Sequence, residues 1–92
     1  MTEQQIQKKI TTYLESLGAY TVKVISASRS GVPDILCCYQ GYFIGIEVKK
    51  PTTLNTVSKL QEYNIKKIQQ AEGYAIVASC VEDVEKLLKE LP

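Results

Sequence analysis

The segment that most constrains the fold is a pair of strand-like stretches joined by a Gln-Gly dipeptide at residues 40–41. Residues 34–39 and 42–49 are rich in apolar, β-branched and aromatic side chains, which is typical of strands. A two-residue connection predicts a tight β-hairpin, and its length determines which residues oppose each other. Counting back from the turn along both strands places Asp34 opposite Glu47, on the same face of the sheet.

Two opposed carboxylates are unfavourable as structure alone, because like charges across paired strands repel. A divalent cation between them removes the repulsion, and carboxylate oxygens are the ligands that Mg²⁺ and Mn²⁺ prefer. Lys49 lies two residues after Glu47 and joins the same face, whereas Lys50 points the other way. Two acids and a lysine on one face are suited to hydrolysing a phosphodiester.

The alternative interpretation is a pair of solvated acids at the strand ends, with a lysine nearby. Gln-Gly is a weaker hairpin signal than Asn-Gly. A loop one residue longer would move one of the two acids to the opposite face of the sheet. The metal site therefore depends on the two-residue turn.

Composition excludes several classes of protein. The chain has 92 residues, a net charge of +1 and no histidine, which excludes histidine-dependent nucleases and histidine-containing zinc sites. Any binding of nucleic acid must then come from local lysines rather than from overall charge. Cys37 and Cys38 are adjacent and Cys80 is distant, which favours free thiols over a disulfide framework. The polar N-terminus and the lack of a long apolar run indicate a protein of the cytoplasm, without membrane association.

The periodicity of apolar residues predicts the order α-β-β-β-α-β-α. The predicted elements are a helix over 3–17, strands over 20–25, 34–39 and 42–49, a polar connection over 50–56, a helix over about 57–72, a strand over 74–79 and a last helix to about 91. The strand–helix–strand step implies a right-handed parallel crossover. We therefore expect one α/β domain over residues 1–92, with a mixed four-stranded sheet, helices on both faces and an extra C-terminal helix.

Local signals refine these elements. Thr56 or Ser58 can cap the helix that follows, and Ser79 with Glu82 matches a capping box for the last helix. The predicted buried stripe of the middle helix contains Leu60, Asn64, Ile68 and Ala71. Gly45 weakens its strand, which indicates that something approaches that face closely.

The loop over 26–33 consists of small residues around the only arginine of the chain, Arg29. Arg29 is either a solvated loop cation or a contact to a phosphate. Gly31 permits a positive φ, and Pro33 marks the start of the strand at Asp34. Of the helix lysines, Lys59, Lys66 and Lys67 are the best candidates for a track along a phosphate backbone.

Taken together, these residues resemble the VRR-NUC family of the PD-(D/E)XK nuclease superfamily, and in particular its small stand-alone members from phages and their bacterial hosts. The matching stretches are Gly-Val-Pro-Asp at 31–34, Gly41, Ile-Glu-Val-Lys-Lys-Pro at 46–51, Leu-Gln at 60–61 and the opening Glu-Gln-Gln-Ile at 3–6. The resemblance covers nearly the whole chain. It implies a restriction-endonuclease-like αβββαβ core and a DNA endonuclease that depends on Mg²⁺ or Mn²⁺.

The resemblance also implies a role for each matching residue. Asp34, Glu47 and the backbone carbonyl of Val48 would bind the metal, with Glu3 approaching it through water. Lys49 would orient the attacking water or stabilise charge at the phosphate, and Gln61 would support the site from its helix. Without the resemblance, Glu3 complements a helix dipole and Gln61 is an exposed polar residue.

Further implications concern the substrate and the assembly. The expected DNA contacts are Arg29, Ser30, Lys50 and Lys59. Similar stand-alone proteins resemble junction-resolving enzymes, so we expect a homodimer that prefers branched DNA such as Holliday junctions. The main alternative is an accessory module that kept the fold and DNA binding but lost the chemistry. A structural or protein-interaction domain with a fortuitous Glu-x-Lys triplet is the remaining alternative.

Overall fold

The hairpin at the centre of the sheet has the predicted register. In the computed structural model, which describes residues 1–92, β2 (Ile35–Tyr39) and β3 (Tyr42–Val48) pair antiparallel. Tyr39 lies opposite Tyr42, and Ile35 lies opposite Ile46. Both turn residues have positive φ, 51° at Gln40 and 85° at Gly41, which is the backbone of a type I′ turn. The next step of this register leads from Asp34 to Glu47.

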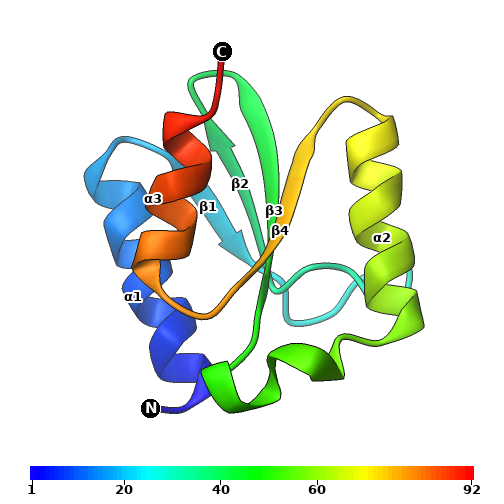
Figure 1. Ribbon diagram of the computed structural model, residues 1–92. Coiled ribbons are helices and arrows are strands. Elements are labelled where there is room, and N and C mark those ends of the chain that lie inside the picture. Colours follow the sequence, from blue (N-terminus) through cyan, green and yellow to red (C-terminus); the bar gives the residue numbers. More distant parts are fainter.

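The other elements extend this hairpin into a mixed sheet (Figure 1). In chain order they are α1 (Glu3–Ser16), β1 (Tyr20–Lys23), the hairpin, a 3₁₀ helix η1 (Pro51–Thr56), α2 (Lys59–Gln70), β4 (Tyr74–Ala78) and α3 (Val81–Lys89). The strand order is β1-β2-β3-β4, with β3 and β4 parallel and the other pairs antiparallel. The predicted order of elements and the mixed four-stranded sheet are confirmed.

Alternation along the strands separates the two faces of the sheet. The main core lies on the face covered by α1 and α3, whereas α2 lies alone on the opposite face (Figure 1). Strand β3 contributes Ile44, Ile46 and Val48 to this main core, and all three are fully buried. Glu47 lies between Ile46 and Val48 in the chain and therefore belongs to the α2 face. None of the three α-helices combines the length and apolar composition that a membrane crossing requires.

Local details add to the predictions and in part correct them. The polar connection after β3 contains a 3₁₀ helix, and of the two candidate caps of α2 the structure uses Ser58. On α2, Leu60 and Ala71 are exposed, because the helix turns Asn64 and Ile68 toward the sheet instead. The strand and helix ends are also slightly shorter than predicted.

The predicted capping box at the start of α3 is wrong. Cys80 is the N-cap residue of α3 and makes no side-chain cap bond. Asp83 satisfies the backbone N–H of Ser79 instead, with its Oδ2 accepting at 2.9 Å. The cap therefore uses the residue after Glu82, because the helix begins one residue later than the pattern suggested.

Two glycines allow α2 to lie close to the hairpin and to the loop before it. A Cβ at Gly45 would lie 2.9 Å from the Ile68 side chain, so the close approach expected at this position is that of α2. A Cβ at Gly31 would lie 2.8 Å from the backbone of Leu60. Gly31 also has a φ of +81°, which side-chain-bearing residues rarely adopt.

Replacing Gly31 by Ala should therefore destabilise the protein more than the backbone angle alone accounts for. Gly18→Ala is the matched control, because Gly18 has a similar φ of +87° but no atom within 4 Å of an added Cβ. We expect Gly18→Ala to cost about 1 kcal/mol and Gly31→Ala to cost at least about twice as much, measured by urea unfolding. Equal losses in the two variants would show that the contact with α2 is not tight.

Candidate active site

Asp34 is held in a fixed position at the beginning of β2. The preceding residue, Pro33, is fully buried, and the Asp34 carbonyl accepts a hydrogen bond from the Val24 N–H at 2.8 Å. Its side-chain Oδ2 accepts another from the Val48 N–H, also at 2.8 Å. The Asp34 backbone is thus bonded to the residue after β1, and its side chain is bonded to the last residue of β3. The second bond orients the carboxylate toward the end of β3.

Glu47 is buried and held from α2. Its side chain is only 3% exposed, and its Oε2 accepts a hydrogen bond from Gln61 Nε2 at 3.2 Å. Gln61 also forms the capping box of α2, because its Oε1 accepts from the Ser58 N–H at 2.9 Å while Ser58 Oγ accepts from the Gln61 N–H at 3.1 Å. Gln61 therefore both completes the capping box of α2 and orients the buried carboxylate of Glu47.

Burial has a strong electrostatic consequence for Glu47. Loss of solvation, with the adjacent Asp34, raises the pKa of Glu47 to about 8, although the charge of Lys49 opposes this rise. Without a bound cation, Glu47 would therefore keep a proton at neutral pH. A divalent cation compensates the same repulsion, and the oxygens of both acids and of the Val48 carbonyl are of the type that Mg²⁺ and Mn²⁺ select.

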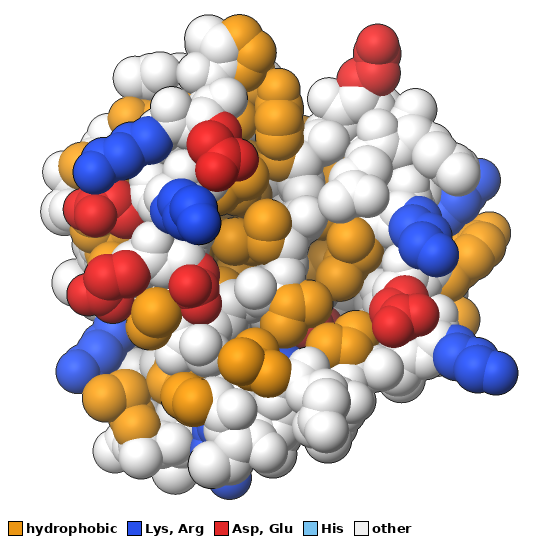
Figure 2. Space-filling view, in the orientation of Figure 1, with side chains coloured by type: hydrophobic (Ala, Val, Ile, Leu, Met, Phe, Trp, Pro, Cys, Tyr) orange, Lys and Arg blue, Asp and Glu red, His pale blue; other side chains and the backbone are white.

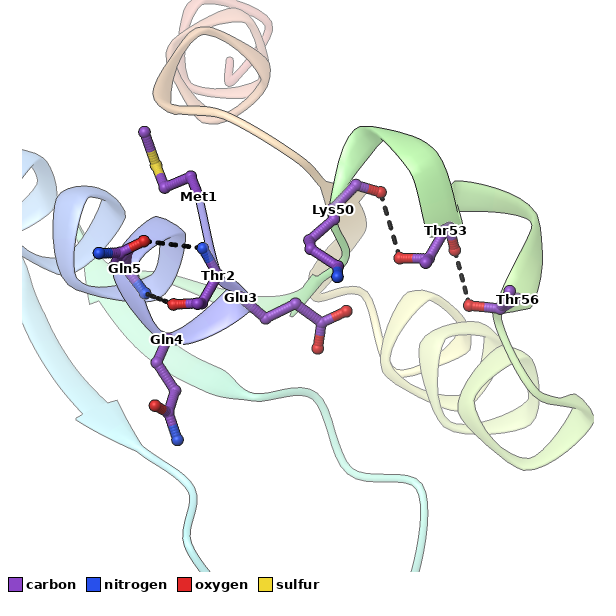
Figure 3. Close-up of a pocket in the computed structure, with 8 residues that line it drawn as sticks. All are labelled: Met1, Thr2, Glu3, Gln4, Gln5, Lys50, Thr53 and Thr56. Atoms are coloured by element: carbon purple, nitrogen blue, oxygen red, sulfur yellow. Dashed lines mark hydrogen bonds between the residues drawn. The ribbon is translucent and has the colours of Figure 1, made fainter.

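Glu3 lies near this pair but does not complete a cluster of three acids. No group of three or more His, Cys, Asp or Glu side chains in the structure could hold a metal ion. The negative charge of Glu3 nevertheless contributes to raising the pKa of Glu47. Its carboxylate extends into a polar hollow of about 700 Å³ between the start of α1 and η1, with Lys50 and Thr53 on the other side (Figure 3).

The residues expected to contact DNA come from three segments, which are the loop before Asp34, the residues after β3 and the start of α2. Arg29 and Ser30 are exposed in the loop before Asp34, and Lys59 is exposed at the start of α2. Lys50 is half-buried, two residues after the end of β3, where it is the N-cap residue of η1. Of the four, Lys50 is the one that shares a hollow with Glu3.

Asn64 is a site residue whose role the sequence did not reveal. Its Nδ2 donates to the Ser30 carbonyl and to the Leu60 carbonyl, both at 2.9 Å. It therefore ties the loop before Asp34 to α2, one helical turn after Gln61. The signal was a polar residue in an otherwise apolar stripe, which only the packing of the loop against the helix explains.

The raised pKa of Glu47 predicts a pH-dependent stability in the metal-free protein. The unfolded chain releases this proton near the ordinary value of 4.5 and the folded chain near 8, so unfolding becomes easier as pH rises between these values. Glu47→Gln removes this titration. The Tm of Glu47→Gln minus that of wild type should therefore increase from about pH 5 to about pH 8 in EDTA. A difference that does not change with pH would contradict the raised pKa.

The fold has a counterpart among proteins of known structure. No family model and no curated protein matches this chain. A solved structure named "VRR_NUC domain" superimposes with a TM-score of 0.80 at 25% sequence identity, covering 98% of this chain and 97% of that one. The similarity extends over the whole sheet and its helices, so it includes the elements that hold Asp34 and Glu47. The chain has a restriction-endonuclease-like fold and is similar over nearly its whole length to that VRR_NUC domain, which supports membership of the VRR-NUC family of nuclease-type domains.

Proposed function

We propose that this protein is a DNA endonuclease that hydrolyses phosphodiester bonds with Mg²⁺ or Mn²⁺. The observation that carries the proposal is the burial of Glu47 beside Asp34, with Gln61 bonded to one of its oxygens. A buried acid beside a second, half-buried acid is costly for folding and is suited to holding a cation. Strongly perturbed carboxylates of this kind cluster at functional sites.

Each residue near the pair has a role in this proposal. Asp34, Glu47 and the Val48 carbonyl hold the cation, which when bound polarises the phosphate and lowers the pKa of bound water. Lys49 follows Val48 and carries its positive charge close enough to affect Glu47, so it can stabilise negative charge that develops at the phosphate. Gln61 keeps the Glu47 carboxylate oriented.

The surrounding polar residues bind the substrate. Glu3 contacts the cation through water, from the hollow that it shares with Lys50 (Figure 3). Arg29, Ser30, Lys50 and Lys59 contact the phosphate backbone, which positions the DNA without reading its sequence. The net charge of only +1 agrees with binding by such local contacts.

The alternative is an accessory module that binds DNA without cutting it. Such a module would be expected to have lost an acid or the lysine, and Asp34, Glu47 and Lys49 are all present. Gln61 is also still bonded to Glu47. These observations favour the enzyme over the module.

Cleavage of labelled four-way junction, flap and linear duplex DNA tests the proposal. Wild type should cut with Mg²⁺ or Mn²⁺ and not with EDTA. Glu47→Gln should abolish detectable cutting, and Lys49→Ala should reduce the rate about 100-fold or more because one source of charge stabilisation is lost. Lys89→Ala is the control, because Lys89 forms only an exposed pair with Glu85 on α3.

The outcomes of this assay separate the two candidate functions. Metal-dependent cutting that Glu47→Gln removes would support the enzyme. DNA binding without cutting under either metal would favour the accessory module. Cutting by Lys49→Ala at the wild-type rate would contradict the role of Lys49.

We also propose a homodimer that acts on branched DNA such as Holliday junctions. A two-fold dimer presents two active sites to two strands of a junction. The outer edge of β4 pairs with no other strand. Apolar side chains, including Leu54, Ile76 and Leu87, surround a hollow of about 370 Å³ beside it, and Figure 2 shows hydrophobic atoms exposed between α3 and α2. A second copy can cover this edge.

Light scattering tests the dimer. Wild type should have about twice the mass of one chain, and Leu54→Glu should shift the mass toward the monomer, because Leu54 is 44% exposed and a charge there disturbs the proposed interface rather than the core. A monomeric wild type without preference for junction DNA would contradict the proposal.

A further inference from the structure

A second groove lies on the α2 face of the sheet, between the β2–β3 hairpin and α2. It has a volume of about 530 Å³ and is lined by Phe43 from β3, Asn64 and Lys67 from α2, and Arg29 from the loop before Asp34. Asn64 is one helical turn from Gln61, which bonds to Glu47. The groove therefore extends from a point one helical turn away from Gln61 toward the β2–β3 turn, where Gly41 and Gly73 also line it.

Asn64 presents an unused hydrogen-bond acceptor to this groove. The side chain is only 5% exposed, and its Nδ2 donates to two backbone carbonyls, those of Ser30 and Leu60. Because both partners are acceptors, the amide orientation is determined and Oδ1 is the remaining atom. Oδ1 accepts no hydrogen bond from the protein, and it is not among the fully enclosed polar atoms without a partner. A donor in the groove would satisfy it.

The other lining groups are an exposed aromatic ring and two cations. Phe43 is 47% exposed, whereas Ile44, which follows it in β3 and points to the opposite face of the sheet, is fully buried. Arg29 and Lys67 approach the groove from opposite elements, and Lys67 lies 6.0 Å from the centre of the Tyr63 ring, which restrains its stem. Glu72 is the one acidic residue of the lining.

We infer that this groove binds one unpaired nucleotide of the DNA strand that occupies the active site. The base stacks on Phe43, its hydrogen-bond donor edge faces Asn64 Oδ1, and the adjacent phosphates lie near Arg29 and Lys67. Every base has a π-face and a donor on its pairing edge, so the groove would accept any sequence. A base within a continuous duplex cannot reach it, so the groove favours strands with unpaired residues.

This inference rests on the proposed nuclease function, because it assumes that a DNA strand occupies the active site. Its test measures DNA binding and does not require cleavage. The measurement is fluorescence anisotropy in EDTA, with labelled duplexes that have either a short single-stranded overhang or blunt ends. Phe43→Leu keeps an apolar side chain and removes the ring, and Lys67→Ala removes a cation. Lys89→Ala is the control, because Lys89 forms only an exposed pair with Glu85 on α3 and does not line the groove.

We expect Phe43→Leu and Lys67→Ala each to weaken overhang binding about fivefold or more, with blunt-end binding changed by less than about twofold. Lys89→Ala should affect both DNAs equally and slightly. An overhang with an abasic residue should bind wild type more weakly, while Phe43→Leu should no longer distinguish it from the intact overhang. Thermal unfolding of each variant confirms that the fold is retained.

Three results would overturn the inference. The first is wild-type overhang binding by both Phe43→Leu and Lys67→Ala. The second is an equal loss of overhang binding in Lys89→Ala. The third is a shift of Phe43→Leu from dimer to monomer in light scattering, which would assign the groove to a second copy. If wild type binds overhangs through Phe43 but cuts no DNA with either metal, the nuclease proposal fails and the groove stands.

Discussion

The burial of Glu47 opposite Asp34 is the interaction on which the functional part of the structure depends. Two carboxylates so placed repel each other, and burial makes the charged form of Glu47 still less favourable, as its raised pKa shows. Nothing in the core requires this arrangement, because the main core is on the opposite face of the sheet. The fold tolerates the pair through the hairpin register and through the bond from Gln61. An arrangement that is costly for stability and well supported by its neighbours is typical of a functional site.

Helix α2 connects this pair to the rest of the molecule. It bonds to Glu47 through Gln61 and to the loop before Asp34 through Asn64, so one helix positions the surroundings of both acids. The helix can do so only because it lies very close to the hairpin and the loop, at Gly45 and Gly31 respectively. A side chain at Gly31 would press on the backbone of α2 at Leu60 and push the helix outward, whereas one at Gly45 would first displace the end of the Ile68 side chain. The glycines therefore act on the site without contacting it.

Local rules explain what the sequence could and could not predict. The register followed from the length of the turn and the alternation of side chains, and the cap at Ser58 followed from a local motif. The depth of Glu47 did not follow, because it depends on how closely α2 packs, and this closeness involves atoms distant in sequence. The role of Asn64 could not be predicted for the same reason, because its partner Ser30 lies in a loop that is distant in sequence from α2. The capping box predicted before α3 shows that a local motif can also mislead. The sequence matched Ser79 with Glu82, but in the structure Asp83 accepts the hydrogen bond from the Ser79 N–H.

Helix α2 also links the groove to Asp34 and Glu47. Gln61 and Asn64 are three residues apart on this helix, which corresponds to a rise of about 4.5 Å. A helix backbone cannot change this spacing without breaking its hydrogen bonds. The groove and the acids are thus held at a constant separation, whatever sequence the DNA has. A protein of this size can in this way select the shape of a strand through backbone geometry, without contacts that read its bases.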